Sequence, residues 1–220
     1  MKIGIDPEDL AGVEGLEDVK VREQSDLYIS VGIGNRKIGL IPSWSLPPVV
    51  TCNPRAAKFC AETCYTKKIR ELYPNVWEAW QHNYRMWCDH PVLTELLIRK
   101  FLAMAMPHLM RLHVGGDFVS KAYLEMWKNI ARDHPSCVFY GYSKVDGLDH
   151  ATLPSNLRIL RSQWPGMPPP RQKHVYRNCW MQDGTEKRIP KTYELCCGDC
   201  PKCGFKCAFG NTDIVINRHN

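Results

Sequence analysis

Residues 109–144, LMRLHVGGDFVSKAYLEMWKNIARDHPSCVFYGYSK, contain the pattern that decides the fold. The apolar run Leu109–Val114 predicts a strand, and Cys137–Tyr142 predicts a second one. Between them, Ser120 can cap a helix that runs to about Asp133. A strand, a helix and a strand with short connections favour parallel strands joined by a right-handed crossover. The stretch therefore predicts an α/β fold.

The segments on either side of this stretch extend the same pattern. Leu157–Ser162 predicts a third strand of the parallel sheet. Asn75–Asp89 and Val92–Met106 predict two helices, and Pro107 ends the second. The aromatic side chains of the first helix recur at helical spacing, which favours a place in the core. They are Trp77, Trp80, Tyr84 and Trp87.

Three parts of one compact unit are predicted along the chain. Residues 1–45 are a lead-in followed by a short hairpin around Asn35, and residues 46–164 are the α/β body. The proline-rich run 165–170 is the clearest linker signal. Residues 171–220 form a small cysteine-rich cap with a last strand at Asp213–Asn217.

Composition limits the class of protein. The chain has 220 residues, 44% of them hydrophobic, and a formal net charge of +6, which permits contact with nucleic acid but does not require it. The acidic N-terminus has no apolar core of a signal peptide, and no stretch approaches the roughly 18 apolar residues of a membrane span. We expect a cytoplasmic protein without membrane contact, whose 11 cysteines are reduced thiols available as metal ligands.

The C-terminal run CCGDCPKCGFKC is the strongest metal signal. Its spacing, C-x2-C-x2-C-x3-C, is that of ferredoxin-type iron–sulfur sites, although the same units also serve tetrahedral zinc. We expect a cluster in preference to zinc. The predicted ligands are Cys197, Cys200, Cys203 and Cys207, with Cys196 as a spare and Cys179 as a substitute.

A second cysteine group lies far upstream, in the loop 51–65. Cys52, Cys60 and Cys64 would leave one metal position open, which is typical of a reactive centre. Alternatively, a fourth cysteine from the C-terminal region closes the site. The sequence does not distinguish an open metal site from a closed one.

Polar residues follow two of the predicted strands, at the edge where parallel sheets place their chemistry. Gly115 and Gly116 would let a small-molecule ligand approach the backbone, and Asp117 could bind its ammonium or hydroxyl group. Lys144 could face the same ligand. The plainer alternatives are an ordinary turn for the glycines and Asp117, and a solvated side chain for Lys144.

Other candidates carry weaker signals. A basic stretch could contact nucleic acid, although a solvated face is the default interpretation. It comprises Arg158, Arg161, Arg171, Lys173 and Arg177. Cys88 and Cys137 are predicted to be core residues.

These motifs, in their order along the chain, resemble the phage gene product 88 family. The resemblance covers residues 46 to 207 and is most specific in the cysteine loop and in HVGGDFVS. Members of this family resemble distant radical SAM proteins, with a TIM-barrel-like α/β fold and an iron–sulfur cluster. The resemblance implies a partial barrel, because the chain is short for eight strands. It also implies a location in the host cytoplasm.

The radical SAM resemblance implies roles for particular residues. Cys52, Cys60 and Cys64 occupy the place of the three-cysteine loop, spaced C-x7-C-x3-C here instead of C-x3-C-x2-C. Gly115, Gly116 and Asp117 match the Gly-Gly-Glu element that holds the amino group of S-adenosylmethionine. The expected cofactors are one or two 4Fe-4S clusters, with S-adenosylmethionine as a further ligand.

The leading hypothesis is an iron–sulfur protein of the radical SAM-like type, whose reaction the sequence does not name. Asp117 and Lys144 are its candidate catalytic residues. The first alternative is a zinc-stabilised nucleic-acid-binding protein. The second is an electron-transfer or redox-sensing cluster protein without a substrate.

Overall fold

A parallel sheet of seven strands forms the centre of the computed structural model, which describes residues 1–6, 26–62, 64, 66–168, 177–182, 189 and 191–217. Its strand order is β3-β4-β5-β6-β7-β9-β8, and every neighbouring pair is parallel. In chain order, the strands are β3 Ser43–Trp44, β4 Leu109–Leu112, β5 Val138–Ser143, β6 Leu157–Ser162, β7 Asn178–Gln182, β8 Glu194–Leu195 and β9 Ile214–Asn217.

The strands predicted from the sequence are confirmed as β4, β5, β6 and β9, with small shifts at their ends. β4 stops at Leu112, two residues before the predicted end. His113 has a φ of 56°, which takes the backbone out of the extended conformation and starts the turn. Strand β6 has the bounds that were predicted.

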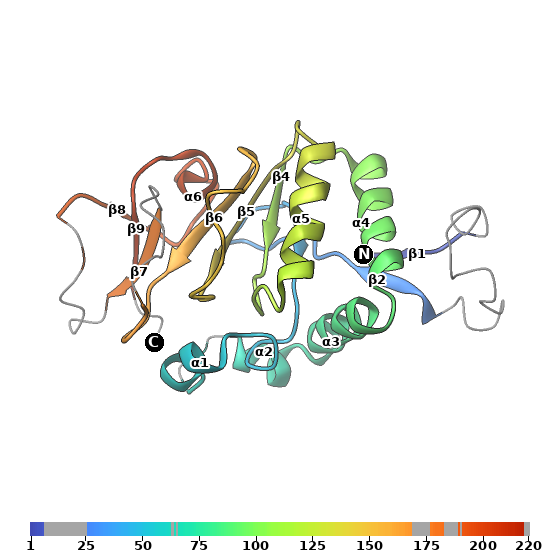
Figure 1. Cartoon of the computed structure of the whole chain (residues 1–220), viewed down its shortest axis with the longest axis horizontal. Coiled ribbons are helices and arrows are strands. Elements are labelled where there is room, and N and C mark those ends of the chain that lie inside the picture. Colours follow the sequence, from blue (N-terminus) through green and yellow to red (C-terminus); the bar gives the residue numbers. More distant parts are fainter. Residues whose placement is uncertain are drawn as a thin grey trace.

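The described part of the chain has six helices, whose places beside the sheet Figure 1 shows. The two helices predicted at Asn75–Asp89 and Val92–Met106 are confirmed as α3, Pro74–Asp89, and α4, Pro91–Ala105. Each has a proline in its first turn. Helix α5, Lys121–Asp133, begins where predicted, because the Ser120 side chain accepts a hydrogen bond from the Tyr123 backbone N–H. The shorter helices are α1 Pro54–Cys60, α2 Lys67–Leu72 and α6 Lys206–Phe209.

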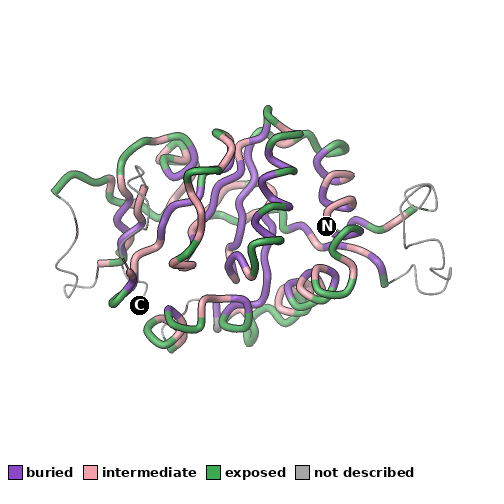
Figure 2. The backbone as a smooth tube through the Cα atoms, viewed as in Figure 1, coloured by how far each residue is buried: buried purple, intermediate pink, exposed green. Residues whose placement is uncertain are grey.

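The two faces of the sheet belong to different cores. Met110 and Leu112 of β4 pack in the large core with residues of α4 and α5, such as Leu97 and Trp127. The alternate residue Leu109 instead joins the smaller core formed with the C-terminal segment. Figure 2 shows the buried central strands between these layers. The second face is where the cysteines of the C-terminal region lie.

The sheet is open as far as the described residues show, with β3 and β8 at its two ends. No closed barrel forms there, although β3 to β7 follow one another in chain order. The C-terminal region, expected as a cap, contributes β7, β8 and β9 to the same sheet. Residues 169–176, which include the last two residues of the predicted linker 165–170, lie outside the described part.

In the N-terminal region, β2, Tyr28–Ser30, pairs antiparallel with β1, Lys2–Gly4. Two isolated antiparallel bridges join the segments on either side of the expected turn, Asn35 with Gly39 and Gly32 with Ser43. The chain thus pairs across the predicted turn through these bridges and not through two full strands. Residues 7–25 of the expected lead-in are outside the described residues.

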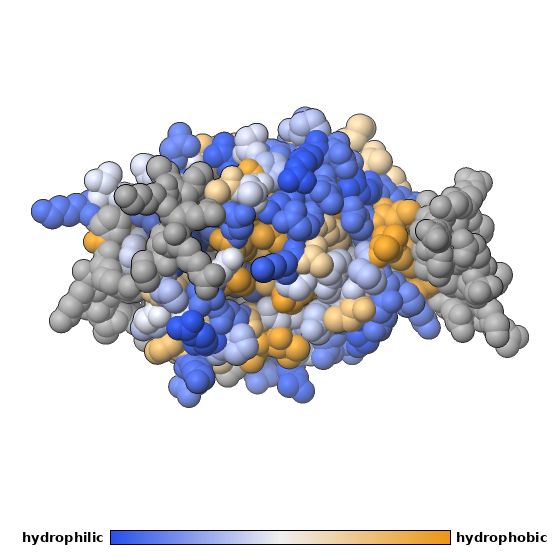
Figure 3. All heavy atoms as spheres, in the orientation of Figure 1, coloured by the Kyte–Doolittle hydropathy of each residue, from blue (hydrophilic) through white to orange (hydrophobic). Residues whose placement is uncertain are grey.

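No helix among the described residues is long and apolar enough to cross a membrane. On the face drawn in Figure 3, hydrophilic residues predominate and hydrophobic ones form smaller groups among them.

Candidate functional site

The carboxylate of Asp117 lies at the carboxyl ends of β4 and β5. One oxygen accepts a hydrogen bond from the Lys144 backbone N–H at 2.7 Å, and the other accepts from Phe118 N–H at 2.8 Å. Asp117 is only 3% exposed. Burial raises its pKa, while the hydrogen bonds from Lys144, Ser143 and Phe118 oppose that rise. Asp117 therefore joins two strand ends, and both of its oxygens are already bonded to the protein.

The two glycines before Asp117 are closely covered by other parts of the chain. A Cβ at Gly115 would lie 2.5 Å from the Trp80 ring. Gly116 has a φ of +83°, and a Cβ there would lie 2.6 Å from the Thr51 hydroxyl and 2.8 Å from the Leu46 carbonyl. Glycine is therefore required at both positions by protein packing, because Trp80, Thr51 and Leu46 fill the space where a Cβ would lie.

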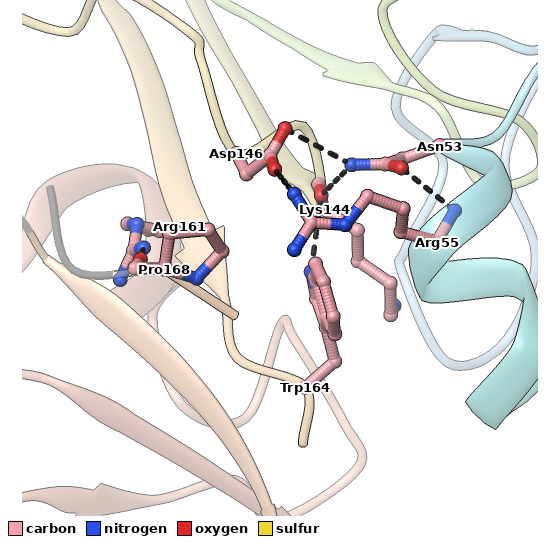
Figure 4. Close-up of polar contacts among 7 residues, drawn as sticks. All are labelled: Asn53, Arg55, Lys144, Asp146, Arg161, Trp164 and Pro168. Carbon is pink, nitrogen blue, oxygen red and sulfur yellow. Dashed lines mark hydrogen bonds and ion pairs between the residues drawn. The ribbon is translucent and has the colours of Figure 1, made fainter. Parts of the chain in front are cut away.

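The upstream cysteine loop contains a helix that the sequence reading missed. In α1, Asn53 caps the first turn by accepting from Arg55 N–H, and Pro54 takes the first helical position. The Asn53 amide also donates to the Lys144 carbonyl at 3.1 Å, as does the Trp164 indole N–H (Figure 4). The signals Asn-Pro and a following helical run were present in the sequence. Together these contacts fix the cysteine loop against the end of β5.

Two further contacts strengthen this attachment. Arg55 forms an ion pair with Asp146 at 2.8 Å, and the ring of Phe59 stacks on Trp164 with centroids 5.7 Å apart. Ala56 is buried with Trp164 and Met167 in a small separate core. The ion pair is largely exposed and contributes little, so the apolar contacts and the hydrogen bonds to Lys144 hold α1 in place.

Two of the three upstream cysteines lie within the influence of Lys144. Burial raises the pKa of Cys52 to about 12 and also raises the pKa of Cys60. The charge of Cys60 adds to the rise at Cys52, and the charge of Cys64 adds to the rise at Cys60. The Lys144 ammonium lowers the pKa of both Cys52 and Cys60. The structure thus relates Cys52 and Cys60 to Lys144, while no such interaction is resolved for Cys64.

Several acidic groups act on the charge of the Lys144 side chain. Burial lowers its pKa, but the charges of Cys60, Asp117, Cys179 and Cys52 together raise it above the ordinary value. Its side chain is half-buried. A cation at this position can stabilise thiolates in two different segments of the chain, the upstream cysteine loop and β7.

The side chains as they stand are not arranged for coordination. No group of three or more His, Cys, Asp or Glu residues in the described part of the chain is placed to hold a metal ion. All 11 cysteines are described, and each is a free thiol. Cys64, for example, shares a hydrogen bond of 2.9 Å with the Thr66 hydroxyl.

The C-terminal cysteines gather on the second face of the sheet. Cys207 and Cys179 are 6% and 5% exposed, and Cys196 packs against the same core. The Tyr142 hydroxyl donates to Cys207 Sγ at 2.8 Å, and the Arg111 guanidinium lies 4.2 Å from the centre of the Tyr142 ring. Arg111 and Tyr142 were not predicted as site residues. A charged residue inside the apolar run LMRL was the available signal.

The three described residues of the basic stretch, Arg158, Arg161 and Arg177, lie in different surroundings. Arg161 is buried and donates to the Pro168 carbonyl. Arg177 donates to the carbonyls of Thr212, Cys207 and Lys206. Arg158 is exposed, while Arg171 and Lys173 lie outside the described residues.

The expected core role is confirmed for Cys137, which is buried, and is wrong for Cys88. Cys88 is exposed because it lies on the outer side of α3, one residue before the helix ends. Of the aromatic residues in α3, Trp80 is buried, and Tyr84 and Trp87 pack partly buried against the large core.

Comparison with known proteins assigns the chain to a family. A family model described as "Gene product 88" matches residues 21–205. The chain belongs to the gene product 88 family. The resemblance to this family seen in the sequence is thereby confirmed, whereas none of the comparisons extends to radical SAM proteins.

Two curated relatives of this gene product 88 protein come from phages. The "Gene 88 protein" of Mycobacterium phage L5 is 31% identical over 123 residues, which is 51% of both chains. The "Gene 88 protein" of Mycobacterium phage D29 is 30% identical over 170 residues, which is 71% of this chain and 69% of the relative. The chain thus spans about half the length of the first relative. No solved structure matches it.

Proposed function

We propose that this gene product 88 protein binds an iron–sulfur cluster through Cys52, Cys60 and Cys64, in a partial barrel of the radical SAM-like type. The observation that carries the proposal is the attachment of the cysteine loop to the end of β5, where the Asn53 amide donates to the Lys144 carbonyl at 3.1 Å and Cys52 and Cys60 interact with the Lys144 ammonium. Thiolates are the ligands of iron–sulfur clusters, and this edge is where parallel α/β proteins place their chemistry.

The order of elements supports the proposal. The cysteine loop follows β3, the first strand of the sheet, and the Gly-Gly-Asp turn follows β4, the second. β3 to β7 then continue in one direction, as in a barrel and unlike a doubly wound sheet, whose order reverses. An incomplete barrel of this kind would leave the cluster loop at its mouth.

The donor set fits a cluster, but the turn does not fit S-adenosylmethionine. Three thiols with one adjacent cation suit an anionic cluster, and Lys144 would offset part of its charge. Asp117 is buried with both oxygens bonded to backbone N–H groups, and the glycines before it are covered by Trp80 and Thr51. Asp117 thus holds the strand ends together, and the proposal includes no step that uses S-adenosylmethionine.

The test is anaerobic purification of the full chain, followed by iron and sulfide analysis and a visible absorption spectrum. The triple variant C52S/C60S/C64S should lose the iron, the sulfide and the absorption that these residues hold. C88S and C137S are matched controls, because one thiol is exposed and one is buried, and both lie outside the triad. These controls should keep the wild-type iron content.

Two results would contradict the proposal. One is a colourless wild-type protein that contains only zinc after anaerobic reconstitution with iron and sulfide. The other is a triple variant that retains the full iron and sulfide content of the wild type.

The two alternatives remain separate hypotheses. Nucleic-acid binding is the less favoured of them, because Arg161 and Arg177 are engaged with backbone carbonyls. Salt-dependent binding to DNA or RNA would support it. Reversible reduction of the cluster, without consumption of any added small molecule, would support the redox alternative.

A further inference from the structure

Cys196 and Cys197 are adjacent but lie in different surroundings. The backbone N–H of Cys196 donates to the Val215 carbonyl at 2.7 Å, so it continues the extended pairing of β8 with β9. Successive side chains of an extended segment point to opposite sides. Cys196 packs against the core of the second sheet face, whereas Cys197 is exposed and directs its thiol to the Asp199 carbonyl.

The next two cysteines lie in a tight turn, CPKCG. Within it, Cys203 N–H donates to Asp199, Gly204 N–H to Pro201, and Phe205 N–H to Cys200. Gly204 has a φ of +64° and open space where a Cβ would be, so glycine is needed for the backbone conformation.

A separate segment fixes this turn. The backbone N–H of Cys200 donates to the Lys37 carbonyl at 2.7 Å, and the ring of Pro201 lies close against Gly39. Contacts with the segment 37–39 thus hold the turn in place without a ligand.

The fourth cysteine comes from α6. Cys207 is buried, its thiol accepts from the Tyr142 hydroxyl, and its carbonyl accepts from Arg177. Below it, the guanidinium of Arg111 lies over the rings of Tyr142 and Tyr140. The Tyr140 hydroxyl is buried in the same region, with no hydrogen-bond partner that the described residues supply.

Two of these residues meet in one core. Cys207 is buried in the core of the second sheet face, and Cys196 packs against it together with Phe205, which follows the turn. Within the turn, the Cys203 thiol lies beside the Cys200 carbonyl, to which it donates at 3.3 Å.

We propose that Cys196, Cys200, Cys203 and Cys207 bind one Zn²⁺ ion as a closed four-thiolate site, and that Cys197 is not a ligand. The site is independent of the cluster proposed for the upstream triad. The gaps between its ligands are three, two and three residues, within the spacing usual for structural zinc.

The chemistry of the site balances. Four thiols lose four protons to solvent as the ion binds, which leaves a site of net charge −2 that the buried Arg111 partly offsets. The side chains must rotate to converge, because Cys203 now donates to the Cys200 carbonyl and Cys207 bonds to Tyr142. Once closed, the site would tie the end of β8 to α6 and to the 37–39 segment.

The experiment compares C196S with C197S in the full chain, each in the C52S/C60S/C64S background so that the triad contributes no metal. Each protein is loaded with zinc sulfate under reducing conditions, freed of excess metal and analysed for zinc by mass spectrometry. The background and C197S should hold about one zinc ion per chain, and C196S should lose most of it. Loss in both variants, loss in neither, or loss only in C197S would overturn the proposal.

A second measurement avoids any folding defect in the variants. The wild-type chain is treated with iodoacetamide with and without zinc, and fragment masses locate the modified thiols. Zinc should slow alkylation of Cys196 by at least about tenfold and leave Cys197 unchanged. Equal rates at Cys196 with and without zinc would overturn the assignment. Neither measurement depends on iron, so the zinc proposal is tested separately from the proposed iron–sulfur cluster.

Discussion

The carboxylate of Asp117 joins β4 to β5 by accepting the backbone N–H of Lys144 at 2.7 Å. The two residues follow neighbouring parallel strands, so this bond sets where the chain leaves each strand. The Lys144 carbonyl in turn accepts from Asn53 and Trp164. One residue thus connects the Gly-Gly-Asp turn, the cysteine loop and the end of β6.

Asp117→Asn should lower the free energy of unfolding by about 1–3 kcal/mol. An asparagine offers one acceptor oxygen where two backbone N–H groups now bond, so its amide would face one of those donors. Urea unfolding measures the change. Asp89→Asn is the control, because Asp89 is exposed on α3, and it should change stability by no more than about 0.5 kcal/mol. Equal, small effects of both changes would contradict the role given to Asp117.

Asn53→Ala should destabilise the protein by about 0.5–2 kcal/mol, because it removes both the cap of α1 and the tether to Lys144. Limited proteolysis should also cut within α1 sooner. Asn75→Ala, in the exposed first turn of α3, serves as the comparison and should leave both measurements near wild type. An unchanged cleavage rate in Asn53→Ala would show that the loop is held by other contacts.

Ser120→Ala should cost about 1 kcal/mol of stability, since the Ser120 side chain accepts from Tyr123 N–H at the start of α5. Thermal unfolding followed by circular dichroism gives the value. Ser155→Ala, at an exposed position between β5 and β6, should be nearly neutral. A neutral Ser120→Ala would mean that packing alone sets the start of α5.

Tyr123→Phe should destabilise the core by about 1–3 kcal/mol. The buried Tyr123 hydroxyl accepts from the Trp44 indole N–H at 2.7 Å and shares a hydrogen bond of 3.0 Å with the His113 ring. The variant leaves both buried groups without this partner. Tyr73→Phe, at an exposed tyrosine, is the matched control. Chemical denaturation that gives equal midpoints for the two variants would contradict this reading.

His113 should make stability depend on pH. Burial, together with the charge of Arg111, lowers the pKa of His113 to about 3. Between about pH 6.5 and pH 3, the unfolded chain binds a proton that the folded chain does not, so stability falls as the pH falls. His113 contributes up to about 1.4 kcal/mol per pH unit in that range. His113→Gln should remove this share, which urea unfolding at several pH values would reveal as a shallower slope. A slope identical to wild type would contradict it.

Local patterns predicted much of the fold correctly. The strands β4, β5 and β6 and the helices α3, α4 and α5 follow from apolar spacing, prolines and the Ser120 cap, which act within a few residues of one another. The missed helix α1 also had a local signal in Asn53-Pro54. The hairpin around Asn35 forms only as isolated bridges, while β2 pairs with β1, a partner that local turn residues do not specify.

The candidate site was predictable only in part. The cysteines could be named from their spacing, and the Gly-Gly-Asp turn and Lys144 from their positions after predicted strands. The engagement of Asp117 with two backbone N–H groups could not, because one donor comes from the next strand along the sheet. The covering of Gly115 by Trp80 and the placement of Arg111 beside Tyr142 also join residues distant in sequence.

The sequence by itself determined the α/β pattern, the supply of thiols and the membership of a family, because spacing, composition and similarity are properties of the chain. Only the tertiary structure decided which thiols share surroundings. It tied the upstream cysteine loop to the Lys144 carbonyl through Asn53, and it turned Cys196 inward and Cys197 outward. The physical reason is that pairing of β8 with β9 fixes which side of the extended chain faces the core, and a spacing rule carries no information about that pairing.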